Sequence, residues 1–187
     1  MIHVGRQRYD GPTRAWLQRS DHYLGNAPPG CLFAVGVTRA IQGLFGLDRS
    51  DELLGLCLVS RPVARRLPQD GTIGEITRMW LAPGLPYGTA SRVLMYAANL
   101  GAARGMQALI AYHDRTRHTG CIYKKAGFKK DGTTAPGKGK GWGNRSDRAS
   151  GEYEATPKRR WRLDLTKRAK VGSEEPGQGL DSPPAQH

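Results

Sequence analysis

The stretch from residue 72 to residue 112 restricts the possible fold more than any other part of the chain. Its pattern predicts a strand at 72–81, a loop rich in glycine and proline at 82–90, a helix from about Ser91, and a strand at 106–112. The helix is predicted because apolar residues recur at the helical period of 3.6, at Val93, Leu94, Ala97, Ala98 and Leu100. A strand, a helix and a strand in this order indicate an α/β fold.

The flanking segments extend this pattern into one domain. Apolar runs at 31–38 and 53–60 predict two buried strands with a loop insertion between them, and alternation at 159–165 predicts a last strand. A short helix is expected at 118–126. This order predicts a single α/β domain over residues 22–165, with a mixed sheet and flanking helices.

The chain ends and the cysteines add further expectations. Residues 1–21 are expected to form an N-terminal segment, and residues 166–187 have the composition of a disordered tail. No apolar run approaches the ~18 residues of a membrane span, and the first residues lack the apolar core of a signal peptide. Three widely spaced cysteines are typical of reduced thiols in a cytoplasmic protein.

The loop before the central helix has the properties of an anion-binding site. The first N–H groups of a helix have no partner inside the helix, and the helix dipole favours negative charge there. Gly84 and Gly88 allow a ligand to approach the backbone closely. Thr89 or Ser91 is expected either to cap the helix or to contact a phosphate.

The positive charge is concentrated in one region. The net charge is +13, and residues 115–170 contribute +12 of it, from 17 basic and 5 acidic residues. Every lysine falls at or after Lys124. This distribution indicates a polyanionic partner bound through phosphates, whereas a solvated basic tail without a partner is the alternative.

A resemblance to a known superfamily rests on the segment after the second predicted helix. Tyr123, Lys125, Gly127 and Phe128 match a Tyr-x-Lys-x-Gly-Phe pattern that follows a strand, a loop, a helix and a strand. In this order the chain resembles the GNAT, or acetyltransferase-like, superfamily, although its loop lacks the usual Gln/Arg-x-x-Gly-x-Gly/Ala sequence. The resemblance implies a GNAT-like sheet and an acetyl-CoA or other acyl-CoA ligand, with contacts from Tyr87, Gly88, Thr89, Ala90, Ser91 and Tyr123.

Residues outside that core indicate a narrower resemblance. His22-Tyr23 precedes the first strand, Arg78 lies in the third, Asp114 precedes the segment His118-Thr119-Gly120-Cys121-Ile122-Tyr123, and Gly-Trp-Gly-Asn-Arg occurs at 141–145. Together these resemble the Mom family of phage DNA-modification proteins, which add a small amide-bearing group to the N6 of adenine and so block restriction enzymes. The resemblance implies an enzyme that is phage or prophage encoded, uses an acyl-CoA donor, and modifies double-stranded DNA in the cytoplasm of a bacterial host.

The basic loop at residues 133–150 fits a DNA partner. It is rich in glycine and too polar for a core, and its tryptophan can stack on a base that has been flipped out of the duplex. The alternative is a loop whose tryptophan packs on the domain. DNA contacts are predicted here and on the following strand, from Lys138, Lys140, Trp142, Asn144, Arg145, Arg148, Arg159 and Arg160.

Four residues are candidates for catalysis. His22 can take a proton from an attacking amine near neutral pH, and Tyr23 can donate to an oxyanion or stack on a base. Arg78, in an apolar strand, is expected to meet a carboxylate such as Glu75 or Asp114, or an anion of the ligand. Asp114, at a strand end, can orient the adenine amine or act as a base, or it can serve as a turn residue.

Metal binding and two other functions stay open. Two histidines and a carboxylate can hold a non-haem iron, and His22, His113, Asp114 and His118 supply such groups, although at no fixed ligand spacing. The chain can also be an ordinary N-acetyltransferase acting on a small amine or a protein, or a non-catalytic DNA-binding protein of this fold. A homodimer is open as the oligomeric state.

Overall fold

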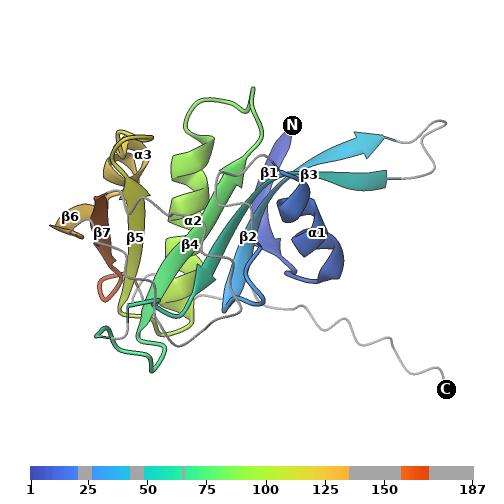
Figure 1. Cartoon of the computed structure of the whole chain (residues 1–187). Helices are drawn as coiled ribbons and strands as arrows, with labels where there is room; N and C mark the ends of the chain where they lie inside the picture. Colours follow the sequence, from blue (N-terminus) through green and yellow to red (C-terminus); the bar gives the residue numbers. More distant parts are fainter. Residues whose placement is uncertain (21–26, 43–48, 65, 135–156, 169–187) are drawn as a thin grey trace, which may run out of the picture.

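The computed structural model describes residues 1–20, 27–42, 49–64, 66–134 and 157–168, and the described strands form one seven-stranded sheet (Figure 1). The strands lie in the order β1-β2-β3-β4-β5-β7-β6, and every neighbouring pair is antiparallel except the parallel pair β4–β5. Their bounds are Ile2–Gln7 for β1, Phe33–Gln42 for β2, Arg49–Ser60 for β3, Ile73–Leu81 for β4, Ala108–Asp114 for β5, Lys129–Thr133 for β6 and Lys158–Asp164 for β7.

Helices cover the two faces of the sheet unequally. Helix α2 (Thr89–Ala103) connects β4 to β5 and packs its apolar side on one face, where Val93, Leu94 and Ala97 are fully buried. Helix α1 (Gly11–Arg19) packs on the other face, where Leu17 contacts a smaller cluster on β2 and β3. The five-residue helix α3 (Cys121–Lys125) lies beside α2, toward the β5–β7–β6 end (Figure 1).

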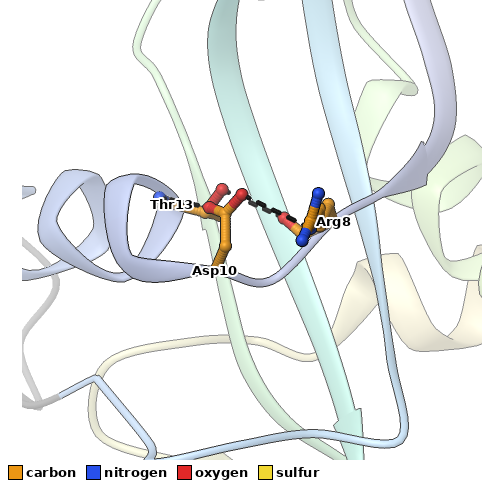
Figure 2. Close-up of polar contacts among 3 residues, drawn as sticks. All are labelled: Arg8, Asp10 and Thr13. Atoms are coloured by element: carbon orange, nitrogen blue, oxygen red, sulfur yellow. Dashed lines mark hydrogen bonds and ion pairs between the residues drawn. The ribbon is translucent and has the colours of Figure 1, made fainter.

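The start of α1 is fixed by local hydrogen bonds. The Asp10 side chain accepts from the Thr13 N–H at 3.1 Å, as an N-cap residue does, and Pro12 stands in the first turn, where an N–H has no helical partner. The Thr13 hydroxyl donates to the Arg8 carbonyl at 3.0 Å, and Arg8 Nε lies 3.8 Å from Asp10 Oδ2 (Figure 2). This start directs Trp16 edge-on to Trp80 of β4, with their ring centroids 5.2 Å apart.

The structure confirms the predicted α/β fold with a mixed sheet and flanking helices, and it corrects several details. Residues 1–20 belong to the domain, because β1 is the edge strand of the sheet and α1 covers one face. Both described ends of the expected loop insertion are strand, since β2 continues to Gln42 and β3 begins at Arg49. The second predicted helix is shortened to α3, and β6 was not predicted.

None of the helices in the described part of the chain is both long and apolar enough to cross a membrane. The three cysteines are free thiols, but they differ in surroundings: Cys57 is fully buried, Cys31 is half-buried and Cys121 is exposed. Burial raises the pKa of the Cys57 thiol to about 12, so this thiol stays protonated in the core at neutral pH.

Candidate functional site

A pocket of about 360 Å³ lies where the parallel strands β4 and β5 part. In these two strands, all of whose residues the structure describes, only Ile73–Ile76 of β4 pair with Ala108–Ala111 of β5. Beyond that point their ends form two sides of the pocket, and the segment leading into α3 closes a third. The lining residues that matter below are Thr77, Arg78, Tyr112, His113, Gly120 and Tyr123.

A β-bulge accounts for the parting of the strands. Leu58 of β3 pairs with Arg78, whereas the next residue, Val59, pairs with Ile76, so Thr77 is an extra residue in β4. The Thr77 hydroxyl shares a hydrogen bond of 3.1 Å with that of Ser60 on β3. A bulge bends its strand and increases the local twist. It therefore turns the end of β4 away from β5 and opens the space that the pocket occupies.

Tyr123 and His113 line the inner side of the pocket, and Trp161 packs behind them. Tyr123, from α3, is 7% exposed and stacks on Trp161 of β7, with ring centroids 5.7 Å apart. Its other neighbour is the His113 ring, at 6.0 Å. Trp161 Nε1–H donates to His113 Nδ1 at 2.6 Å. Tyr123, which is predicted to contact acyl-CoA, thus lies in a closely packed aromatic group.

The start of α2 presents backbone donors beside this pocket. Gly88 occupies the N-cap with a φ of 86°, a left-handed conformation that suits glycine. The Thr89 N–H and hydroxyl both donate to the Pro86 carbonyl, and the Arg92 N–H donates to the Gly88 carbonyl. The N–H groups of Ala90 and Ser91 belong to the first turn, where no helical carbonyl lies one turn earlier to accept from them. They are therefore the donors that the helix can offer to an anion.

The side chains at the start of α2 do not cap the helix, contrary to one of the two expectations. The Ser91 hydroxyl is 3.4 Å from the Ile122 carbonyl and links α2 to α3. Tyr87 is 89% exposed, and Lys125 Nζ lies 4.1 Å from the centre of its ring, a cation–π distance. Lys125, Lys124 and Arg92 are exposed basic side chains near the helix start, which complements the phosphates of a nucleotide.

Arg78 and Glu75 lie on the opposite side of β4 from α2. Arg78 Nη1 donates to the Thr77 carbonyl at 2.7 Å, and Glu75 Oε2 accepts from the Val63 N–H at 2.8 Å. Burial raises the pKa of Glu75, and the Val63 hydrogen bond and the charges of Lys158 and Arg78 only partly oppose it. The charge of Arg78 thus acts on Glu75, one of the two carboxylates predicted as its neighbours.

Replacing Glu75 by glutamine should stabilise the protein more at neutral than at acidic pH. Because the folded-state pKa is raised, this carboxyl favours folding when protonated, and that contribution is lost as pH rises through the raised value. Glutamine keeps an acceptor for Val63 and carries no charge. Urea unfolding of both proteins should therefore show a difference that grows from about pH 4.5 to about pH 7.5. Glu52→Gln, at a partly exposed carboxyl, is the control. A difference in the free energy of unfolding that does not change with pH, or an equally large change for Glu52→Gln, contradicts this expectation.

Asp114 is the last residue of β5 and is 5% exposed. Its Oδ1 accepts from the Thr116 N–H at 2.8 Å and the Thr116 hydroxyl at 2.6 Å, and its Oδ2 lies 3.7 Å from Arg117 Nε. The same Asp-x-Thr turn occurs at Asp70 and Asp164, both exposed. The turn alone therefore explains why the Asp-x-Thr sequence occurs at this position. Asp114 differs from Asp70 and Asp164 because it is buried, beside two residues that line the pocket, His113 and Arg117.

The face of the sheet opposite α2 is basic over β7 and β6. Trp161, Leu163 and Leu165 face α2, so by strand alternation Lys158, Arg160 and Arg162 lie on the other side, which we name the open face. Lys129 of β6 pairs with Arg162 and is exposed. Arg160 hydrogen-bonds to Tyr112, and its Nε lies 2.9 Å from Asp131 Oδ2. Its predicted contact with DNA must therefore coexist with these two partners.

Arg159, the other predicted DNA contact on β7, lies on the α2 side. It pairs in register with His113, and its charge lowers the pKa of that histidine. The two predicted contacts of β7 therefore face opposite sides of the sheet.

The basic segment at 135–156 and several predicted residues lie outside the described residues. These are His22, Tyr23, Lys138, Lys140, Trp142, Asn144, Arg145 and Arg148. The residues that flank the segment are described: the Thr134 N–H donates to the Lys158 carbonyl at 2.8 Å, and Lys158 pairs with Asp114. The segment therefore leaves and rejoins the sheet at the end where the pocket lies.

Of the predicted metal ligands, the structure describes all except His22. Within the described ranges, no three His, Cys, Asp or Glu side chains are grouped so that they can hold a metal ion. Asp114 and His118 lie in this part of the chain, and His22 does not. An iron site therefore stays a prediction that depends on His22.

Two pocket features were missed from the sequence. The sequence predicts Trp161 only as a strand residue, whereas its bond to His113 joins positions 48 residues apart. Tyr112, on the open face, lines the pocket and hydrogen-bonds to Arg160. Both pairings follow from the β5–β7 register, in which Tyr112 is opposite Arg160 and Ala111 opposite Trp161. No local pattern in the sequence gives that register.

Comparison with known proteins identifies one family. The profile of the Mom protein family matches residues 13–140, which is more than half of the chain. The match includes β2 to β6 and every lining residue of the pocket. No curated protein matches the sequence.

Solved acetyltransferase structures have a similar fold. One is a Bacillus subtilis acetyltransferase in complex with CoA, at 12% identity, covering 88% of this chain and 99% of that chain, with a TM-score of 0.57. A spermidine/spermine N-acetyltransferase from Vibrio cholerae in complex with manganese ions has 9% identity, covers 91% and 96%, and has a TM-score of 0.55. An IAA acetyltransferase from Bacillus cereus has 14% identity, covers 88% and 100%, and has a TM-score of 0.54. At these identities the similarity establishes the GNAT-like fold alone.

Proposed function

Because the chain belongs to the Mom protein family, we propose that it is a transferase that modifies the N6 of adenine in double-stranded DNA with a group taken from an acyl-CoA. The observation that carries this proposal is the position of the pocket. It lies between the start of α2, with its anion-binding donors, and the open face, with its basic side chains. One pocket thus adjoins a place for a nucleotide-bearing donor and a place for a polyanionic acceptor.

The residues at the start of α2 suit the phosphates of CoA. The N–H groups of Ala90 and Ser91 and the cations of Lys125 and Arg92 can bind them, and Tyr87 can stack on the adenine ring of the cofactor. The acyl end would then reach the pocket beside Tyr123, which is buried. The bound cofactor supplies the acyl group, and the residues of this chain orient it.

The open face and the basic segment suit duplex DNA. Lys129, Lys158 and Arg162 provide charge for phosphates, and residues 135–156 join the sheet beside Asp114. The N6 of adenine is not accessible to such a pocket inside the duplex, so the base must flip out. We propose that Asp114 receives its amine, with His22 as the proton acceptor, and that the modified DNA resists restriction in a phage-infected bacterial cell.

Mass spectrometry of nucleosides tests the proposal. Plasmid DNA from cells that express the protein should contain a modified deoxyadenosine, and digestion by restriction enzymes should slow. The modification should depend on His22 and Asp114, so each alanine variant should lose it. Unmodified deoxyadenosine in the presence of soluble, folded protein would count against DNA as the acceptor.

A second candidate is N-acetylation of an amine that is not part of DNA, which the acetyltransferase fold favours. This enzyme should bind acetyl-CoA and release free CoA when offered a small amine or a peptide. Its affinity for DNA should lack a steep dependence on salt. The reverse result, with DNA binding but no thioester consumption, would indicate a binding protein that retains the fold.

A further inference from the structure

His113 is held in one tautomer by Trp161. The indole Nε1–H donates to His113 Nδ1 at 2.6 Å, and an indole nitrogen can only donate. The Nδ1 atom is therefore the acceptor, and the proton of the neutral imidazole must lie on Nε2. Both side chains are buried, at 4% and 3% exposure, so water does not compete for this bond.

The surroundings of His113 favour the neutral ring. Burial is the largest cause that lowers its pKa, and Arg159 of β7, His118 and Arg115 lower it further. The charge of Asp114 raises the pKa of His113, but the pKa remains lowered overall. Its aromatic neighbours are Tyr123, which stacks on it, and Trp161, whose ring is tilted by 35°. The hydrogen-bond geometry requires the same state, because an Nδ1 atom that accepts from the indole carries no proton and the ring is then neutral.

The protein makes room for this ring at the edge of the pocket. A Cβ atom added to Gly120 would come within 2.8 Å of His113 Cε1 and of Trp161 Cζ2, so a side chain at position 120 would collide with both rings. Gly120 also has a φ of 75°, which favours glycine. With Nδ1 occupied by Trp161, the Nε2–H is the one polar donor that His113 can offer to a ligand in the pocket that it lines.

We propose that His113 donates a hydrogen bond from Nε2 to the carbonyl oxygen of the bound acyl group, and that Trp161 is the positioning residue that fixes this donor. The proposal rests on the proposed function insofar as acyl-CoA is the ligand of this pocket. It assigns His113 the role of an electrophilic donor. It also means that His113 cannot act as a base, because its Nε2 already carries the proton.

The physical reason is the negative charge that develops on an acyl oxygen during reaction. This charge appears both when a nucleophile attacks the thioester carbon and when the methyl carbon next to it loses a proton. A neutral N–H donor that is already oriented stabilises the charge without reorganisation, and loss of one such donor typically costs about 100- to 1,000-fold in rate. A neutral histidine used as an electrophile is a known solution to the same problem.

Nitrogen-15 NMR of the full-length protein with labelled histidine tests the tautomer and its ligand. We expect His113 to show a protonated Nε2 and an unprotonated Nδ1, and the Nε2 signal to shift on addition of acetyl-CoA more than on addition of CoA. In Trp161→Phe the Nδ1 atom loses its donor, so the other tautomer, with a protonated Nδ1, should become populated. A protonated Nδ1 in the unaltered protein overturns the proposal directly.

Two replacements of His113 separate donation from packing. The amide nitrogen of glutamine reaches about the position of Nε2, whereas that of asparagine reaches about the position of Nδ1, and both remove the stacked ring. We expect His113→Gln to retain the preference for acetyl-CoA over CoA and at least about tenfold more thioester turnover than His113→Asn. Equal loss in both variants, at equal thermal stability, assigns His113 a packing role and overturns the proposal.

The outcomes also separate this proposal from the proposed function. A response of Nε2 to acetyl-CoA in a protein that leaves DNA unmodified supports the role of His113 and refutes DNA as the acceptor. Binding of acetyl-CoA without any change at Nε2 refutes the role of His113 alone. Failure to bind acetyl-CoA at all refutes both the acyl donor and the hydrogen bond.

Discussion

Replacement of Asp114 by asparagine should lower the rate of DNA modification by about 100- to 10,000-fold, the usual contribution of a positioned acid or base. Asparagine keeps an oxygen that can accept both bonds from Thr116, so the turn after β5 should persist. The negative charge near the pocket is lost, and with it the charged acceptor that presents the adenine amine to the proposed base, His22. The measurement is the amount of modified nucleoside per mole of protein over time.

The chain contains its own controls for this prediction. Asp70 and Asp164 form the same turn with Thr72 and Thr166, but they are exposed and lie away from the pocket. Asp70→Asn and Asp164→Asn should therefore modify DNA within about twofold of the unaltered protein. If Asp114→Asn also modifies DNA at that rate, Asp114 is a turn residue like the other two and its proposed role is wrong.

The sequence was sufficient to predict elements whose signal is local. The apolar face of α2 is an example, since Val93, Leu94, Ala97 and Ala98 recur at the helical period and all are fully buried. Local signals are also present for α1, which was not predicted: Asp10 caps it and a proline lies in its first turn. Residues 129–133, by contrast, have no apolar pattern, because β6 gains its structure from pairing with β7.

The candidate site was predictable only residue by residue, and its geometry was not. Asp114, Tyr123 and Ser91 were chosen from motifs, and the structure places them around one end of the sheet. The bulge at Thr77 that opens the pocket depends on how β3 pairs with β4, which no local pattern encodes. For the same reason the hydrogen bond between Trp161 and His113 emerges only from the folded structure.

Reversal of two charges on the open face should weaken DNA binding strongly and leave acyl-CoA binding unchanged. Lys129 and Arg162 are cross-strand neighbours on β6 and β7, and the proposed donor site lies on the other side of the sheet, at the start of α2. If each contacts a phosphate, Lys129→Glu with Arg162→Glu should reduce the slope of log affinity against log salt by about 1.8, and affinity at moderate salt by at least about tenfold. Fluorescence anisotropy of a labelled duplex over a salt titration measures both.

A matched variant separates local contact from overall charge. Arg6 lies on β1, at the opposite edge of the sheet, and Arg19 is exposed at the end of α1. Arg6→Glu with Arg19→Glu changes the net charge by the same amount, so it reduces long-range attraction equally, but it should leave the salt slope within about 0.5 of the original. Equal effects of the two double variants would mean that DNA responds to the charge of the whole protein. A large effect confined to Lys129 and Arg162 would place the duplex on the open face, from which a flipped adenine can enter the pocket beside Tyr112.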